Sequence, residues 1–273
     1  SLRLDTSTDP LADPPSISHT VLNAIGGSYW SGGGQGITWQ FDVQQAGLYR
    51  IDLRVLSKYN DGLSSFRQIR VDGKVPFQEF LCYEFAYGDW TTTGLTDENG
   101  DPYLVYLEEG THTLELVVVT SAYAEILVEL EGTLNILSDV IQNIIRITGI
   151  DPDVNFDYRL DARIPGLMDN MQAISDSLLK QIELLTNMSE KTPGTVNNLK
   201  EIQYRVARMI EDPDSIAAGL NKMIEDQTTL SNWINGFNNL PLMLDYIVIN
   251  SPDVAVEEKH ANVYQKLWAG VQT

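Results

Sequence analysis

The sequence predicts an α+β fold, in which an antiparallel β-sandwich is interrupted by a four-helix bundle inserted before the last strand. Three observations predict it. From about residue 20 to residue 120, apolar and polar residues alternate with the period of two that is typical of strands. After Ser121 the apolar period becomes helical, and at residues 242–249 the strand period returns. We therefore expect a sandwich made of residues 1–121 and 241–250, an inserted bundle at 122–240, and a tail or linker at 251–273.

Two segments show the strand alternation most clearly. One face of the first carries Ile37, Trp39, Phe41 and Val43. One face of the second carries Tyr49, Ile51, Leu53 and Val55, while Arg50, Asp52 and Arg54 point the other way. Turn signals such as Asp72-Gly73 and Asn99-Gly100 recur at roughly 8–12-residue spacing, as in an all-β sandwich.

The helical part predicts four amphipathic helices joined by short links. The first carries an apolar stripe from Tyr123 to Ile144, and Gly149 is its expected end. The second spaces Ile164, Met171, Leu178 and Leu185 by sevens. Thr192-Pro193 and Asp212-Pro213 predict the starts of the third and fourth helices, because proline suits the first helical turn. None of these helices is stable alone in water, so we expect an up-down bundle.

The segment at residues 242–249 is apolar on both faces and rich in β-branched residues. A strand of this kind lies inside a sheet that is covered by other elements. We therefore expect it to complete the sandwich rather than to follow an independent helical domain.

Composition excludes several classes of partner. The chain has 38 acidic and 18 basic residues, for a formal net charge of −20. This charge repels nucleic acid and anionic lipid, and it suits neutral ligands. No apolar run reaches the length of about 18 residues that a membrane span needs. The single cysteine, Cys82, cannot form an internal disulfide, which fits a secreted protein of a Gram-positive bacterium.

Several short motifs resemble a known family. The ordered set resembles carbohydrate-binding modules of the family-6 and family-35 type, and comprises Gly47-Leu48-Tyr49-Arg50-Ile51, Arg70-Val71-Asp72-Gly73, Trp90, Tyr106-Leu107-Glu108-Glu109-Gly110 and Leu244-Asp245-Tyr246-Ile247. Leu22-Asn23-Ala24-Ile25-Gly26-Gly27 and Ile147-Thr148-Gly149 further resemble the N-terminal region of large extracellular solute-binding proteins of bacterial ABC importers. That resemblance implies a jelly-roll, galactose-binding-like sandwich with a helical insertion ahead of its last strand.

The resemblance also implies ligands and partners. In these modules an acidic motif on the first strand binds a structural calcium together with an aspartate of the last strand. Asp245 matches that aspartate, but no Glu-Ala-Glu motif precedes Leu22. The implied ligand is an oligo- or polysaccharide, and the implied partners are other domains of a solute-binding protein and an importer permease. The implied location is extracellular, at the cell surface.

Sugar binding requires flat aromatic faces beside amides and carboxylates. Trp30 lies in a Gly/Ser-rich loop beside Gln35, where it is either a ligand platform or a loop anchor. Tyr59 and Asn60 lie in a later loop, and Asn250 follows the last strand. We take these five residues as the candidate ligand-binding set. Trp39 shares a face with Ile37 and Phe41, and both it and Trp90 are expected in the core.

Two functions are compatible with these patterns. The first is a non-catalytic carbohydrate-binding module of an extracellular sugar-capture protein. The second is a structural or interaction module in which the bundle docks on partner domains and the sugar site is vestigial. Catalysis has little support, because His19, His112 and His260 show no metal-ligand spacing and no nucleophile motif is present.

Overall fold

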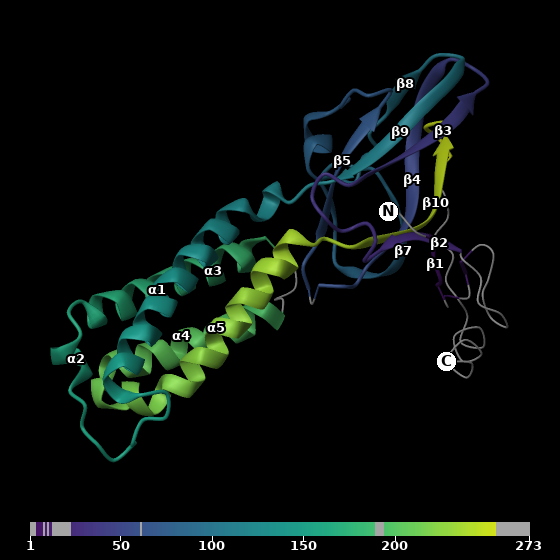
Figure 1. Cartoon of the computed structure of the whole chain (residues 1–273). Coiled ribbons are helices and arrows are strands. Elements are labelled where there is room, and N and C mark those ends of the chain that lie inside the picture. The colour runs from purple at the N-terminus through teal and green to yellow at the C-terminus, as the bar shows by residue number, and fades with distance from the viewer. Residues whose placement is uncertain are drawn as a thin grey trace. The chain divides into compact units, whose positions relative to one another are not determined.

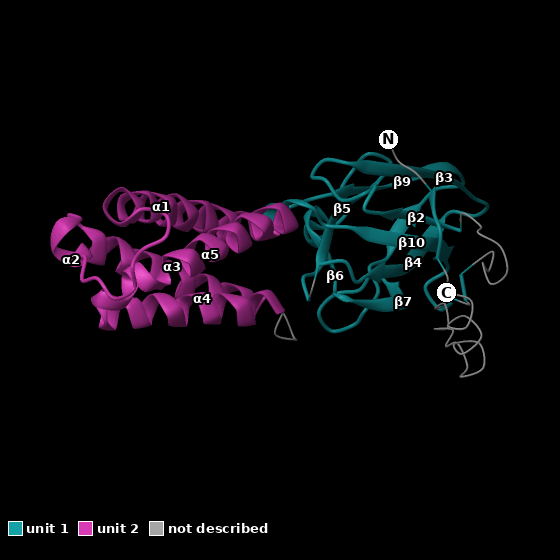
Figure 2. Ribbon diagram, turned by 60° about the horizontal axis from the view of Figure 1, so that its bottom comes forward, with its two compact units in different colours: residues 1–121, 238–273 teal, residues 122–237 magenta. Residues whose placement is uncertain are grey.

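The computed structural model of the chain describes residues 4–7, 9, 11–12, 23–60, 62–188 and 194–254. The chain divides into two compact units, one made of residues 1–121 and 238–273 and the other of residues 122–237 (Figure 2). The first unit contains antiparallel sheets and the second contains helices (Figure 1). The predicted α+β fold is therefore confirmed.

The sandwich unit is built from two antiparallel sheets. The six-stranded sheet has the order β1-β2-β10-β4-β7, with β8 also paired to β4. The four-stranded sheet has the order β3-β9-β5-β6. The strands are β1 Leu4–Asp5, β2 Ala24–Gly27, β3 Gly36–Val43, β4 Gly47–Ser57, β5 Ser65–Val71, β6 Tyr83–Phe85, β7 Gly88–Gly94, β8 Val105–Leu107, β9 Gly110–Val118 and β10 Leu242–Asn250.

The period-two alternation fixes which side chains form the core between the sheets. On β4, Ile51, Leu53 and Val55 are buried, as are Ile69 of β5 and Leu116 of β9. The opposite face of β4 departs from the prediction. Arg50, Asp52 and Arg54 do lie on the outer face, but Asp52 and Arg54 are only 2% exposed. These two charges can be buried because each of them forms an ion pair on the outer face.

The last strand lies inside the six-stranded sheet, as its two-sided apolar composition predicts. Leu242–Leu244 pair with β2 on one side, and β10 pairs with β4 on the other. The register shifts between Leu244 and Tyr246, which places a bulge at Asp245. The prediction that the bundle is inserted before a strand of the sandwich is thus confirmed.

The helical unit contains four long helices and one short helix in its described residues. They are α1 Ala124–Thr148, α2 Leu160–Arg163, α3 Leu167–Asn187, α4 Gly194–Glu211 and α5 Ile216–Asn238. Gly149 ends α1 with φ of 79°, a conformation that favours glycine, as expected. Pro213 lies in a short 3-10 turn, η3 Pro213–Ser215, ahead of α5. The predicted helix start at Thr192-Pro193 lies outside the described residues, as does the tail from residue 255.

Each long helix buries one apolar stripe against the others. Leu130, Ile144, Met171, Leu199 and Leu220 are each fully buried. Polar contacts between helices fix their register. The Gln181 amide of α3 donates to the Thr133 hydroxyl of α1 at 3.1 Å, and the Arg205 guanidinium of α4 donates to the Asp226 carboxylate of α5 at 3.1 Å. Matching polar groups of this kind favour one pairing of the helices over shifted alternatives.

Candidate functional site

A cavity of about 320 Å³ opens between the two sheets of the sandwich. It is lined by Ile25, Trp39, Gln40, Phe41, Leu114, Leu244, Asp245, Tyr246, Ile247 and Ile249. We call it the inter-sheet cavity. Its lining comprises aromatic residues, aliphatic residues and a few polar residues, which is the composition that ligand pockets commonly show.

Strand lengths explain why the cavity is open. β2 pairs with β10 only at Leu242–Leu244, so in the described residues the stretch from Tyr246 to Asn250 pairs with β4 alone. In the other sheet, β3 is the edge strand. Two sheet edges therefore lie beside the cavity, and aromatic residues from both of them, Trp39 and Tyr246, remain partly exposed.

The structure decides between the two roles left open for Trp30 and corrects the expectation for Trp39. Trp30 is completely buried, so it cannot serve as a ligand platform, and the loop-anchor alternative is correct. Trp39, expected in the core, is partly exposed and lines the cavity. The rings pack edge to face with centroids 6.3 Å apart, so Trp30 supports Trp39 from beneath.

Trp30 is buried because distant parts of the chain converge on it. The Arg67 guanidinium of β5 lies over its ring at 4.3 Å from the centroid and donates to the Trp30 carbonyl at 3.0 Å and to the Leu240 carbonyl at 2.9 Å. Arg67 is itself fully buried, and this burial lowers its pKa to about 9. The guanidinium thus joins the Trp30 loop to Leu240, two residues before β10.

Gln35 shapes the glycine-rich loop rather than offering a free amide. Its side-chain oxygen accepts hydrogen bonds from the backbone N–H groups of Ser31 and Gly32, both at 3.0 Å. Its carbonyl accepts a bond from the Trp30 indole N–H at 3.2 Å. The side chain is exposed, but its oxygen is already used within the loop. The structure therefore gives Gln35 a loop-forming role.

Tyr59 and Asn60 lie just beyond the end of β4. Tyr59 is 41% exposed, and its hydroxyl lies 3.8 Å from the Met243 sulfur. Partial burial and nearby Asp5 raise the Tyr59 pKa. The Asn60 amide donates to the Asn239 carbonyl at 2.6 Å. Neither residue lines the inter-sheet cavity, and both contact the chain where it enters β10.

Asn250 lies at the other end of the sandwich, opposite Arg50. The stretch of β4 from Arg50 to Ser57 is roughly 23 Å of extended chain, so Asn250 does not meet Tyr59 or Asn60. The predicted five-residue set is therefore not one site. Residues from the two edge segments, Trp39, Phe41 and Tyr246, replace it at the cavity.

Asp245 has a different role from the calcium ligand that the resemblance implies. The Arg54 guanidinium donates to its carboxylate at 2.7 Å and to the Asp9 carboxylate at 2.9 Å. The Asp245 side chain is completely buried, and Arg54 already supplies a positive charge to it. Among the described residues no group of three or more acidic, histidine or cysteine side chains could hold a metal ion. These residues do not fit a calcium site.

The ion pairs form a polar layer on the outer face of the six-stranded sheet. Arg50 binds Asp52 through two hydrogen bonds of 2.9 and 2.8 Å. A Cβ at Gly94 would lie 2.7 Å from the Asp52 carboxylate, so the pair rests directly on this glycine. Trp90 lies 4.9 Å from the Arg54 guanidinium and is partly exposed rather than core. This layer is satisfied internally and needs no ligand.

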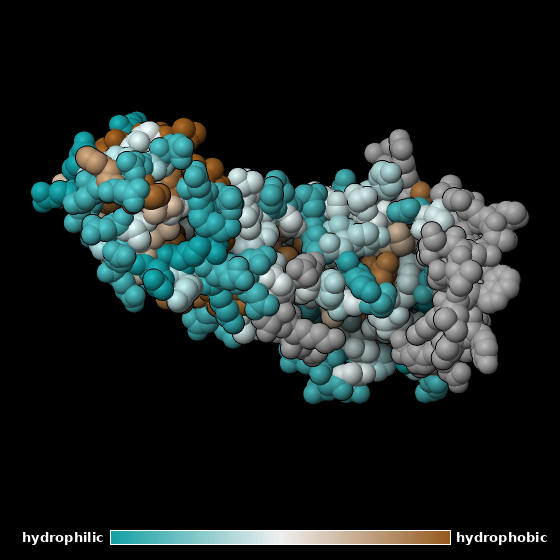
Figure 3. All heavy atoms as spheres, turned by 90° about the horizontal axis from the view of Figure 1, so that it is seen from below, coloured by the Kyte–Doolittle hydropathy of each residue, from teal (hydrophilic) through white to brown (hydrophobic). Residues whose placement is uncertain are grey.

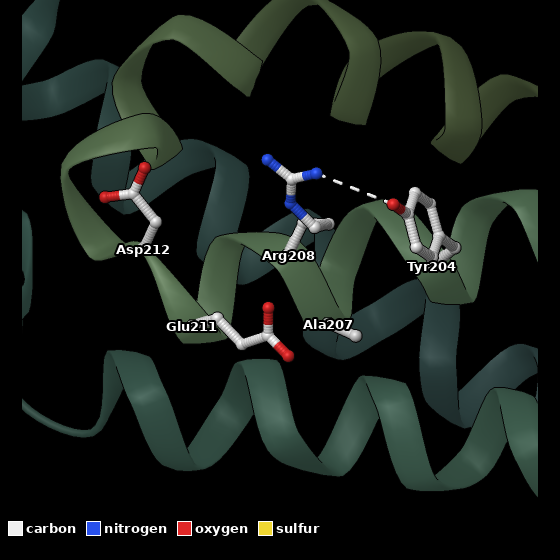
Figure 4. A pocket seen from close by; sticks show the side chains of 5 residues that line it. All are labelled: Tyr204, Ala207, Arg208, Glu211 and Asp212. Atoms are coloured by element: carbon white, nitrogen blue, oxygen red, sulfur yellow. Dashed lines mark hydrogen bonds between the residues drawn. The ribbon is translucent and has the colours of Figure 1, made fainter.

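A second hollow, of about 560 Å³, lies on the end of α4 (Figure 4). Its lining comes from one helix and the residue after it, namely Tyr204, Ala207, Arg208, Glu211 and Asp212. Arg208 donates to the Tyr204 hydroxyl at 3.5 Å. A single helix cannot enclose a ligand from two sides, so this hollow is a weaker candidate than the inter-sheet cavity.

The helical unit matches a known domain family. Residues 125–239 match the bacterial solute-binding protein, 4-helix bundle domain. This match confirms the predicted resemblance for the inserted bundle. Among the residues that the structure describes, no helix is long and apolar enough to cross a membrane.

The sandwich resembles parts of several solved structures. A family 35 carbohydrate-binding module from Clostridium thermocellum is 15% identical, with a TM-score of 0.28 over 35% of this chain and 66% of that one. A family 35 module from an environmental isolate is 20% identical, with a TM-score of 0.25 over 33% and 58%. A cycloisomaltooligosaccharide glucanotransferase from a Paenibacillus species is 22% identical, with a TM-score of 0.27 over 34% and 12%.

The matched region thus spans less than two thirds of each of these chains. No curated protein matches this chain. The fold assignment rests on the strand pairing described above, and the likeness to solute-binding proteins rests on residues 125–239.

Proposed function

We propose that the sandwich binds a carbohydrate chain at the inter-sheet cavity. The observation that carries the proposal is the lining of this cavity, in which Trp39 and Phe41 of β3 and the apolar residues Leu244, Ile247 and Ile249 of β10 border a space of about 320 Å³. Pyranose C–H faces pack on aromatic rings, and the lining also includes the polar residue Gln40. The Tyr246 hydroxyl lies 3.0 Å from the Thr92 hydroxyl, on the face of the sheet that carries Arg54, so it does not point into the cavity.

The chain then acts as the sugar-binding, non-catalytic region of an extracellular solute-binding protein that serves an ABC importer in a Gram-positive bacterium. The match of the bundle to a solute-binding-protein domain supports this assignment. The resemblance of the sandwich to a family 35 carbohydrate-binding module, at 15% identity, is compatible with this assignment. Asp245, the acidic residue of the cavity lining, supports a non-catalytic role, because its carboxylate is paired with Arg54.

Calorimetric titration with soluble xylan, mannan, α-glucan and β-glucan oligosaccharides tests the proposal. We expect at least one of them to bind, and Trp39→Ala to weaken that binding at least about tenfold, or about 1.4 kcal/mol. Tyr106→Ala is the matched control, because Tyr106 is 59% exposed on the same unit but does not line the cavity. The proposal is refuted if none of these glycans binds. It is also refuted if Tyr106→Ala weakens glycan binding and Trp39→Ala does not.

A second candidate function is docking of the bundle on partner domains. It is favoured by one observation: the loop between α1 and α2 exposes Ile150, Val154 and Phe156. Sugar binding by the sandwich gives these side chains no role.

A further inference from the structure

The loop at residues 149–159 joins α1 to α2 at one end of the bundle (Figure 1). We call it the tip loop. It exposes Ile150 at 69%, Val154 at 69% and Phe156 at 59%. The other exposed large apolar side chains of the described bundle, Val128, Leu179 and Tyr204, lie singly on helices. Figure 3 shows apolar residues in brown on the helical part of the molecule. A cluster of this kind in a short loop marks an interaction site more often than a scattered residue does.

Hydrogen bonds within the tip loop fix its backbone. The Asp153 N–H donates to the Tyr158 hydroxyl at 3.0 Å, and the Phe156 N–H donates to the Asp153 carbonyl at 3.1 Å. The Asp157 carboxylate accepts a bond from the Arg159 N–H at 2.9 Å. The rings of Phe156 and Tyr158 pack edge to face at 4.8 Å. Because the loop is held in place, docking costs less conformational entropy than it would for a mobile loop.

The charges of the tip loop indicate what covers its apolar side chains. Asp151, Asp153 and Asp157 alternate with them, and Arg159 is the single basic residue, so the loop carries three negative charges and one positive charge. A second copy of this chain, with a net charge of −20, is repelled by such a loop, and so is an anionic lipid surface. A surface that pairs lysine or arginine with an apolar pocket complements both features.

We propose that the tip loop is a docking site for a protein whose apolar pocket, bordered by lysine or arginine, receives Val154 and Phe156. The sandwich and its cavity take no part in this contact. Loss of docking therefore leaves glycan binding unchanged, and the two proposals can fail independently.

A photo-crosslinking residue placed at Val154 in the full chain, in the cells that produce it, tests the proposal. The matched control is the same residue at Val128, which is 70% exposed on α1. We expect one protein to crosslink at position 154 and not at position 128. That protein is then purified and titrated with the full chain at low salt and at high salt.

The expected result is binding that weakens at least tenfold with Val154→Ser combined with Phe156→Ser, and that weakens with added salt. Val128→Ser has no effect, and the thermal transitions of all variants stay alike because the replaced side chains are exposed. The proposal is overturned if position 154 gives no crosslink beyond that at position 128. It is also overturned if the captured protein binds the double variant as tightly as the wild type, or if the tip loop mediates self-association or vesicle binding instead.

Discussion

The guanidinium carbon of Arg67 lies 4.3 Å from the centroid of the Trp30 indole ring, and both side chains are fully buried. Hydrogen bonds from Arg67 reach the carbonyls of Trp30 and Leu240. The cation–π contact compensates in part for removing a guanidinium from water. It also ties the loop before β3 to the residues before β10, so this contact links two segments that are far apart in the sequence.

Trp30→Ala is expected to destabilise the sandwich by about 3–5 kcal/mol, because it leaves a large cavity beneath Trp39 and exposes Arg67 to an unfilled space. Trp39→Ala is expected to cost clearly less, because Trp39 is already partly exposed. Denaturant unfolding of the two variants measures both values. Equal losses of stability would contradict the assignment of Trp30 to the core and Trp39 to the cavity wall.

The role of Asp245 predicts insensitivity to calcium. Asp245→Asn is expected to lower stability by about 1–3 kcal/mol, because Arg54 loses the fully buried one of its two carboxylate partners and keeps Asp9. Calcium or a chelator is expected to leave the thermal midpoint of the wild type unchanged. Asp89→Asn serves as a control, because its pair with Lys58 is exposed and contributes little. A rise of the thermal midpoint with calcium that Asp245→Asn abolishes would restore the calcium-site prediction.

Gly94→Ala is expected to cost about 1–3 kcal/mol through overpacking. The added Cβ would lie 2.7 Å from the Asp52 carboxylate and 2.8 Å from the Arg50 guanidinium, so the bidentate pair must move. Gly88→Ala, on the same strand, is the control, because its Cβ would meet nothing within 4 Å. Similar thermal midpoints for the two variants would show that the ion pair relocates without loss.

The contact between His112 and Asp72 predicts a pH dependence of stability. The His112 ring forms one hydrogen bond of 2.7 Å with the Asp72 carboxylate and another with the Glu108 carbonyl. Both bonds raise the His112 pKa, and the bond with Asp72 has the larger effect. The same His112 contact lowers the Asp72 pKa against the opposing effect of desolvation. The histidine contribution is present below its unfolded pKa of about 6.5 and is lost as pH rises through the folded value. The aspartate contribution is lost as pH falls through its folded value, below about 3.8.

His112→Gln is therefore expected to destabilise the protein most at about pH 5 and least above the raised His112 pKa. Denaturant unfolding of both proteins across this range gives the difference directly. A difference that does not change between pH 5 and pH 8 would show that the charge on His112 is irrelevant.

Local patterns in the sequence predict most of the fold but not the site. Alternation along β4, the end of α1 at Gly149 and the two-sided apolar composition of β10 are each readable within a few residues. The burial of Trp30 is not, because it depends on Arg67 and Leu240, which are brought to it only by the completed sheet. The exposure of Trp39 likewise depends on how far β2 extends along β10. A Trp and a Phe on one face of an edge strand were the available signal, but the sequence does not reveal which strand is the edge.

The final prediction concerns the two ends of the insertion, which meet at the glycine-rich loop before β3. Asn239 forms a β-bridge with Gly32, and a Cβ at Gly33 would lie 3.6 Å from the Thr120 hydroxyl. The Gly34 N–H also donates to the Val118 carbonyl at 2.9 Å. The chain therefore leaves and re-enters the sandwich at one place, which is the geometry that a tolerated insertion requires.

Replacing residues 124–238 with a short Gly/Ser linker is expected to leave a folded sandwich with a single cooperative transition. Truncation after Asn239 is expected to unfold it, because removal of β10 separates β2 from β4 and leaves their backbone groups unpaired. Arg67 also loses the Leu240 carbonyl in that variant. Calorimetric melting of both proteins distinguishes them. A truncated chain that melts like the linker variant would show that β10 is dispensable and that the sandwich is complete without it.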